Sequence, residues 1–115
     1  MNLCINTRDE LHIINLDNVA YLKANGNFTE FHLLDNTIKV LLPCLSDYEI
    51  EIKKLYMNNT SPFLRTGRSY IINTRTITSI YLHKQIIYFK PANMPPLLLS
   101  KTQLHRLKEY LAKQT

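Results

Sequence analysis

Hydrophobic and polar residues alternate through the first forty positions of the chain, as they do in strands that bury one face. The apolar runs are LCIN, ELHIIN, VAYLKA, FTEFHLL and TIKVLL, and short polar segments separate them. Two of these segments, Asn25-Gly26 and Asp35-Asn36, favour tight hairpin turns because Asn and Gly tolerate positive φ. The pattern predicts a β-meander.

Over about residues 44–57 the hydrophobic residues recur every three or four positions, which predicts a helix. Ser46 and Glu49 have the spacing of a capping box, so Ser46 is the predicted N-cap. The helix is predicted to end at Asn58-Asn59. The apolar face that repeats at intervals of three and four consists of Leu45, Tyr48, Ile52, Leu55 and Tyr56.

Strand patterns return in the second half of the chain as SYIIN, TSIYLH and QIIYFK, which we expect to form a further antiparallel set. After a proline-rich segment and LLLS, a terminal helix is predicted over about residues 101–113, with Ser100 as N-cap and an apolar face of Leu104, Leu107 and Leu111. No repeats or linkers interrupt the sequence. We therefore predict a single, mainly β domain over residues 1–115.

Charge divides the chain unevenly. Residues 1–61 carry five basic and eight acidic side chains, a net charge of −3, whereas residues 62–115 carry nine basic side chains and one acid, a net charge of +8. We call residues 62–115 the basic half. A foldable segment with charge of one sign indicates a polyanionic partner, nucleic acid or anionic lipid, although surface lysines also serve solubility alone.

The two cysteines, Cys4 and Cys44, have no spacing typical of a disulfide framework or a metal site, which favours a reducing, cytoplasmic setting. The sequence shows no signal-peptide pattern and no apolar run near the roughly 20 residues that span a bilayer.

Catalytic chemistry is not indicated. The chain has two glycines and therefore no glycine-rich phosphate loop. Its four histidines are scattered singly, and none pairs with another ligand at metal-binding spacing. We predict a protein that is not an enzyme and that needs no metal or cofactor.

The segment FLRTGRSYIIN, residues 63–73, joins a short cationic loop to a strand. Arg65 and Arg68 flank Thr66-Gly67, and a guanidinium group can match the O6 and N7 acceptors of guanine. The strand behind such a loop would hold it rigidly, as precise readout requires. The composition alone does not choose between DNA and RNA. Because the tyrosines of the basic half have core spacing, a base-stacking platform is less favoured.

Three segments together resemble a known family. FLRTGRSYIIN resembles the hallmark of the LytTR DNA-binding domain, the output module of bacterial response regulators of the LytR/AgrA type. VAYLKANGNFTEFHLLDN is similar to the upstream strand, Gly-Asn-aromatic turn and strand of that family. LLLSKTQLHRLKEYL resembles its closing strand and helix. The resemblance covers roughly residues 3–113, in the order and spacing of the family.

This resemblance implies an elongated fold of small antiparallel sheets with a helix between them. It implies that loops at the sheet edges, rather than a helix, enter the major groove of double-stranded DNA, at paired direct repeats. The residues expected to bind DNA are Asn25, Asn27, Phe28, Thr29, Arg65, Arg68, Ser69 and Lys101, with Gly26 in the same turn.

The chain departs from the family at three of these places. Gly67 stands where histidine is frequent, Lys101 stands where members carry arginine, and Phe28 takes a position that some members fill with a polar, base-contacting residue. We therefore expect the fold and DNA binding to be retained and the DNA sequence to differ.

Each site residue also has a structural interpretation. For Asn27 and Gly26, a hairpin turn alone is as well supported as a contact with DNA, and Ser69 is expected to fix its strand. Packing is favoured for Phe28, and an ion pair with an acid for Arg65. Contact with DNA is favoured for the two remaining cationic residues, Arg68 and Lys101.

The sequence thus predicts a bacterial transcriptional regulator domain, either a fragment of a longer regulator with a receiver or sensor domain or a stand-alone member. A second copy is the expected partner on repeated sites. The alternative is a non-catalytic interaction module whose basic half binds an acidic protein or anionic lipid, and single-strand or RNA binding ranks below it.

Overall fold

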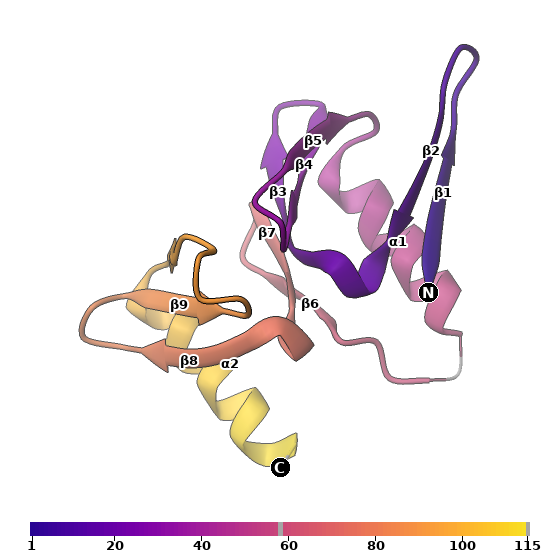
Figure 1. Cartoon of the computed structure of the whole chain (residues 1–115). Coiled ribbons are helices and arrows are strands. Elements are labelled where there is room, and N and C mark those ends of the chain that lie inside the picture. Colours follow the sequence, from indigo (N-terminus) through magenta and orange to yellow (C-terminus); the bar gives the residue numbers. More distant parts are fainter. Residues whose placement is uncertain (58, 115) are drawn as a thin grey trace.

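The chain begins with a hairpin that stands apart from the rest of the β-structure. The computed structural model describes residues 1–57 and 59–114, and in it β1 (Asn2–Asn6) pairs only with β2 (Leu11–Asn15) (Figure 1). A short 3-10 turn, η1 (Leu16–Asn18), then leads into the main sheet. The predicted strands are present, but the predicted meander is wrong at this point, because the hairpin buries Leu3, Ile5 and Ile14 on one face as a separate layer.

The central sheet has five strands in the order β5-β4-β3-β7-β6. β3 (Val19–Asn25), β4 (Phe28–Leu33) and β5 (Ile38–Leu41) form the meander that the sequence predicts. β6 (Phe63–Thr66) and β7 (Tyr70–Asn73) join it from the second half of the chain, with Leu22 opposite Ile71 across β3 and β7. The prediction that SYIIN groups with the later strands is therefore wrong.

The helix α1 (Leu45–Tyr56) buries Leu45, Tyr48, Ile52 and Tyr56, most of the predicted stripe. Its N-cap is Cys44, in extended conformation, so the predicted capping box is wrong. Ser46 lies inside the first turn, and the Glu49 side chain is used in an ion pair with Arg65 instead. Of the predicted end, Asn58 lies outside the described residues, and the helix ends at Tyr56.

A third, smaller sheet and the terminal helix complete the fold. After the 3-10 turn η2 (Thr74–Thr76), β8 (Ile77–Tyr81), β9 (Ile86–Phe89) and β10 (Leu97–Leu98) pair in the order β10-β9-β8. The helix α2 (Lys101–Gln114) follows and buries Leu104 and Leu107, while Leu111 is partly buried against the same cluster. The terminal helix is thus confirmed, together with its apolar face.

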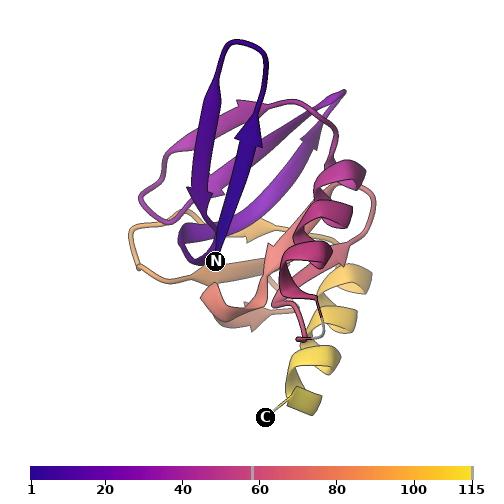
Figure 2. The same cartoon turned by 90° about the vertical axis from the view of Figure 1, so that its right-hand side faces the viewer.

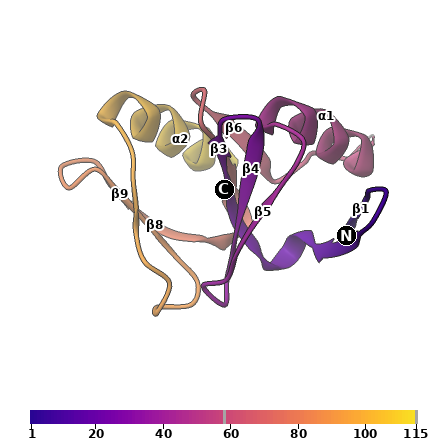
Figure 3. The ribbon, with the colours of Figure 1, turned by 90° about the horizontal axis from the view of Figure 1, so that it is seen from above.

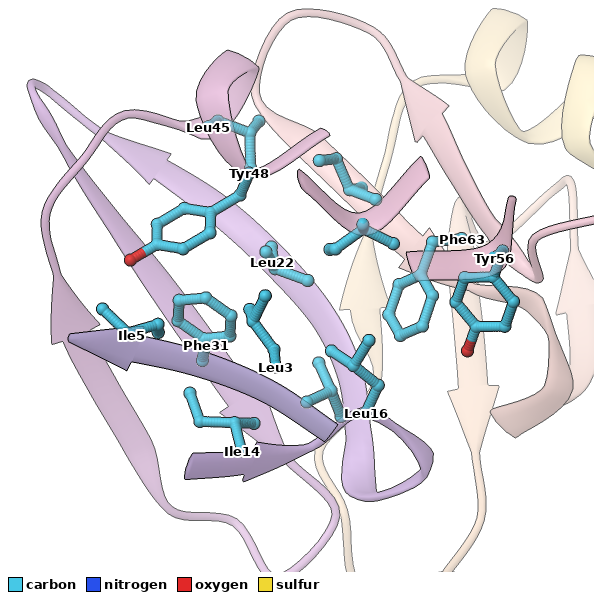
Figure 4. Packing of buried hydrophobic residues seen from close by; sticks show 13 residues of the cluster. Leu3, Ile5, Ile14, Leu16, Leu22, Phe31, Leu45, Tyr48, Tyr56 and Phe63 are labelled. Carbon is cyan, nitrogen blue, oxygen red and sulfur yellow. The ribbon is translucent and has the colours of Figure 1, made fainter. Parts of the chain in front are cut away.

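Two hydrophobic cores lie on opposite faces of the central sheet. One, between that sheet, α1 and the β1–β2 hairpin, contains Phe31, Tyr48 and Ile71 (Figure 4). The other lies between the central sheet, the β8–β9 hairpin and α2, and contains Ile72 and Leu104. Consecutive residues of β7 therefore enter different cores, which is why this strand is apolar on both faces.

The two-core arrangement makes the domain elongated, with principal extents of 45 × 31 × 25 Å (Figures 1 and 2). The mainly β fold of small antiparallel sheets with one internal and one terminal helix is as predicted, and the described residues form three such sheets. Within the described residues, no helix is long and apolar enough to cross a membrane.

Candidate nucleic-acid interface

The turn between β3 and β4 presents three of the predicted site residues at the surface. Asn25 pairs with Phe28, so Gly26 and Asn27 form a two-residue turn, in which Gly26 adopts a φ of +58°. The side chains of Asn25, Asn27 and Phe28 are exposed. Packing is the favoured role of Phe28 in the sequence, but 44% of its surface is accessible at the start of β4, directly after the turn.

The next predicted site residue in the chain, Thr29, points the other way. It is fully buried, and its hydroxyl donates a hydrogen bond of 3.0 Å to the carbonyl oxygen of Pro43. In this conformation the side chain of Thr29 supports the segment that leads into α1 and has no surface to offer to a ligand.

The side chain of Arg65 anchors the loop between β6 and β7. Its Nε donates a hydrogen bond of 3.0 Å to the carbonyl oxygen of Gly67, and its Nη2 donates one of 2.8 Å to that of Arg68. Nη1 forms an ion pair of 3.0 Å with Glu49 of α1. The predicted pairing of Arg65 with an acid is confirmed, and one guanidinium group thus fixes two carbonyl groups of the loop to a helix.

The β6–β7 loop also contacts the β3–β4 hairpin. The backbone N–H of Ala24 donates a hydrogen bond of 2.8 Å to the carbonyl oxygen of Ser69. Because this bond fixes the backbone on one side of the loop and Arg65 fixes the other, the loop has little freedom at its base. The side chains of Arg68 and Ser69 are exposed beyond it.

The start of α2 is the third segment at this edge. Ser100 is the N-cap as predicted, since its Oγ accepts a hydrogen bond of 3.2 Å from the N–H of Gln103. The side chain of Gln103 lies over Gly67, where an added Cβ would come within 2.1 Å of its Nε2. Lys101, the first residue of the helix, is exposed.

These contacts bring the β3–β4 turn, the β6–β7 loop and α2 to one side of the molecule, the upper side in Figure 3. Residues 65–69 and 100–108, which form the loop and the first turns of α2, carry five cationic side chains and no acid: Arg65, Arg68, Lys101, Arg106 and Lys108. Glu49 neutralises Arg65 in part. The other cationic groups make this edge attractive to a polyanion.

An acidic residue missed by the sequence analysis lies behind the β3–β4 turn. Glu30 of β4 accepts a hydrogen bond of 3.0 Å from Nδ2 of Asn25 through one oxygen, and its other oxygen lies 2.9 Å from Nε2 of His32. The contact between Glu30 and Asn25 could have been predicted from the sequence. A two-residue turn puts Asn25 opposite Phe28, and Glu30, two residues after Phe28, lies on the same face of the sheet.

His32 is itself fixed by a stacked aromatic ring. The rings of Tyr21 and His32 lie 4.3 Å apart at an angle of 14°. Burial, with smaller effects of Tyr70 and Glu30, raises the pKa of Tyr21 to about 12, which favours its neutral phenol still further. A chain of side-chain contacts, from Tyr21 through His32 and Glu30 to Asn25, thus connects the second core to the exposed turn.

Asn73, at the end of the hallmark segment, has a structural role. It is buried, and its Nδ2 donates hydrogen bonds of 3.3 and 2.9 Å to the carbonyl oxygens of Leu16 and Val19. These bonds tie β7 to the turn that begins β3. Across residues 1–57 and 59–114, no three His, Cys, Asp or Glu side chains gather where they could hold a metal ion.

The fold and the exposed edge together define a β-rich domain whose cationic edge, formed by two loops and the start of a helix, suits a polyanion. A family model described as the LytTr DNA-binding domain matches residues 9–112, and the chain belongs to this family. Family membership makes the chain a DNA-binding domain of a regulator.

A solved structure with the same fold is a LytTr DNA-binding domain from Bacillus cereus, described as part of a methyl-accepting/DNA response regulator. The similarity has a TM-score of 0.65 at 20% sequence identity and covers 96% of this chain and 95% of the other. Among curated proteins, no match is found.

Proposed function

We propose that this domain binds a specific sequence of double-stranded DNA by inserting the β3–β4 turn, the β6–β7 loop and the start of α2 into successive parts of the major groove. The observation that carries the proposal is the pair of contacts that join these segments, the hydrogen bond from Ala24 to Ser69 and the packing of Gln103 on Gly67. Segments that are fixed to one another present their side chains at set distances, as readout of a base sequence requires.

Each exposed side chain has a role in this proposal. Arg68 contacts a guanine edge through its planar guanidinium, and Lys101 contacts a phosphate or a base at the neighbouring position. Ser69 and Arg65 hold the loop, and of the two only Ser69, with an exposed side chain, is free to add a phosphate contact. Asn25, Asn27 and Phe28 form the second reading element, whereas Thr29 contributes through its buried hydrogen bond.

The wider setting follows the family. We infer a cytoplasmic bacterial transcription regulator of the two-component type, in which two copies of this domain occupy paired direct repeats. A receiver or sensor domain on the same polypeptide would control the spacing or concentration of the two copies. Membership in a family of DNA-binding domains supports a role in binding and not in catalysis.

The direct experiment is selection of bound duplexes from a random pool with the whole chain. Enrichment of a short motif, and of two such motifs in the same orientation at a fixed spacing, is the expected result. The Arg68→Ala protein, selected in parallel, should enrich a motif that has lost information at one position. If the wild-type chain enriches no motif, the basic half serves another partner, and binding to vesicles with anionic lipid and to acidic proteins becomes the measurement to make.

A further inference from the structure

The amide of Asn25 has one orientation only, because of the group that it contacts. Its Nδ2 lies 3.0 Å from a carboxylate oxygen of Glu30. A carboxylate accepts hydrogen bonds and cannot donate, so the NH₂ group, and not the amide oxygen, must face Glu30. The second oxygen of Glu30 lies 2.9 Å from Nε2 of His32. The side chain of Glu30 is only 20% exposed and that of His32 only 14%.

This orientation leaves Asn25 with a defined pair of groups for a ligand. One N–H is used by Glu30, and the remaining N–H donor and the Oδ1 acceptor have no partner among residues 1–57 and 59–114, on an exposed side chain. In the major groove adenine presents N7 as acceptor and its N6 amino group as donor, which is the complementary pair. Guanine presents two acceptors there, so it would leave Oδ1 without a donor.

Phe28 adds an apolar surface beside that pair. It lies directly opposite Asn25 across the β3–β4 ladder and is 44% exposed. Side chains in directly opposite positions share a face and have Cβ atoms about 4.5–5.5 Å apart. Thymine is the base that carries a methyl group in the major groove, and aromatic side chains contact it there. An adenine contact and a thymine contact are thus available side by side.

We infer that the β3–β4 turn reads an A·T base pair, with Asn25 on adenine, Phe28 on the methyl group of the paired or adjacent thymine, and Glu30 as the positioning residue that fixes the Asn25 amide. The inference rests on the proposed function and adds the base identity to it. Glu30 does not attract DNA, since its charge has the same sign as the phosphates; its effect is on orientation alone.

The test uses the duplex selected by the wild-type chain and alters one functional group at a time. Adenine is replaced by 2-aminopurine, which keeps N7 but removes the amino group from the major groove, and thymine is replaced by uracil, which lacks the methyl group. At one position we expect the 2-aminopurine duplex to bind about tenfold more weakly to wild type, as for loss of one bidentate pair. Uracil at that pair or its neighbour should also weaken binding.

The variants assign each loss to its residue. Asn25→Ala should bind the adenine and 2-aminopurine duplexes equally, and Phe28→Ala should bind the thymine and uracil duplexes equally. Ile13→Ala, at an exposed position of the separate β1–β2 hairpin, is the control and should keep both sensitivities. Glu30→Gln should lose most of the adenine preference, because glutamine can donate as well as accept, while its affinity for random duplex stays equal or rises as a negative charge is removed.

The outcomes separate this inference from the function beneath it. If wild type selects a motif but no A·T pair in it responds to either base analogue, the inference is overturned without any variant, and the proposed function stands. It is also overturned if Asn25→Ala keeps the sensitivity of wild type, or if Glu30→Gln keeps the full preference. If no motif is selected at all, both the function and the inference fail.

Discussion

Arg65 and Glu49 join the β6–β7 loop to α1 through an ion pair of 3.0 Å in which both side chains are about three-quarters buried. The same guanidinium group donates to the carbonyl oxygens of Gly67 and Arg68. The first arginine of the hallmark segment, Arg65, therefore anchors the loop to α1. The second, Arg68, is exposed at the tip of the loop.

Replacing Arg65 with alanine should lower the free energy of unfolding by about 2 kcal/mol, since it removes hydrogen bonds to a charged group and leaves Glu49 partly buried without its cation. Urea denaturation measures this. Lys54→Ala is the control, because its pair with Glu51 is exposed and should contribute less than about 0.5 kcal/mol. Equal effects of the two changes would show that Arg65 does not brace the loop.

The two glycines offer a matched comparison of turn strain and contact. Gly26 and Gly67 have φ of +58° and +70°, so alanine at either position should cost about 1–2 kcal/mol of stability through the left-handed backbone. Only Gly67 has a neighbour, the Gln103 side chain, within reach of an added Cβ. Gly67→Ala should therefore be the more destabilising change in a thermal melt, by a small margin only, because the end of the flexible Gln103 side chain can move aside.

A double variant then separates the contact from the strain. Gln103→Ala in the Gly67→Ala background should recover the part of the loss that exceeds that of Gly26→Ala. If Gly26→Ala and Gly67→Ala lose the same stability, and Gln103→Ala recovers none of it, the Gln103 side chain is not held against Gly67.

Local periodicity predicted the elements well, because each strand and helix is visible within its own window of sequence. The terminal helix with Leu104 and Leu107 and the hairpin at Gly26 were found in this way. The partner of β7 was not, since pairing Ile71 with Leu22 joins residues far apart in the chain. The N-cap of α1 was misplaced because residue preference favours Ser46, while burial of Leu45 starts the helix earlier.

The candidate site was predicted from the sequence in outline and not in its supporting contacts. The resemblance identified the loops around Asn25 and Arg68 and the start of α2, and charge indicated the kind of partner. The contacts that hold these loops, Glu30 on Asn25 and Gln103 on Gly67, depend on side-chain positions in three dimensions. Thr29, grouped with the turn by its place in the motif, points inward because side chains alternate along β4.

The main effect of changes in the apolar face of α2 should be on the stability of the domain. Leu104 is fully buried, so Leu104→Ala should cost about 2–5 kcal/mol of unfolding free energy, whereas Leu111→Ala, at a partly buried position, should cost less. Deleting residues 102–115 should lower the melting temperature further, as it removes Leu104 and Leu107 together. A truncated chain as stable as the parent would mean that the second core does not need α2.

Salt dependence checks the electrostatic part of the function. If the exposed cations of the basic half neutralise phosphates, the logarithm of affinity should fall linearly with the logarithm of salt concentration, with a slope near −0.9 for each phosphate contact. Lys101→Gln should make this slope shallower by about 1 if Lys101 contacts a phosphate. An affinity that hardly changes between low and physiological salt would speak against nucleic acid as the partner.

Arg68 provides the sharpest test of specific readout. Its side chain is exposed beyond a loop that Arg65 holds, so its removal should leave stability nearly unchanged. Loss of a bidentate arginine–guanine pair costs about 1–3 kcal/mol of discrimination, so Arg68→Ala should weaken binding to the selected duplex about tenfold or more and to random duplex much less.

Fluorescence anisotropy with both duplexes measures this difference, and the melting temperature of the variant serves as the control for folding. Equal weakening on the two duplexes would make Arg68 a phosphate contact and move base readout to the β3–β4 turn and Lys101. If neither affinity changes, the β6–β7 loop does not touch DNA, and its rigid attachment to α1 must serve another contact of the domain.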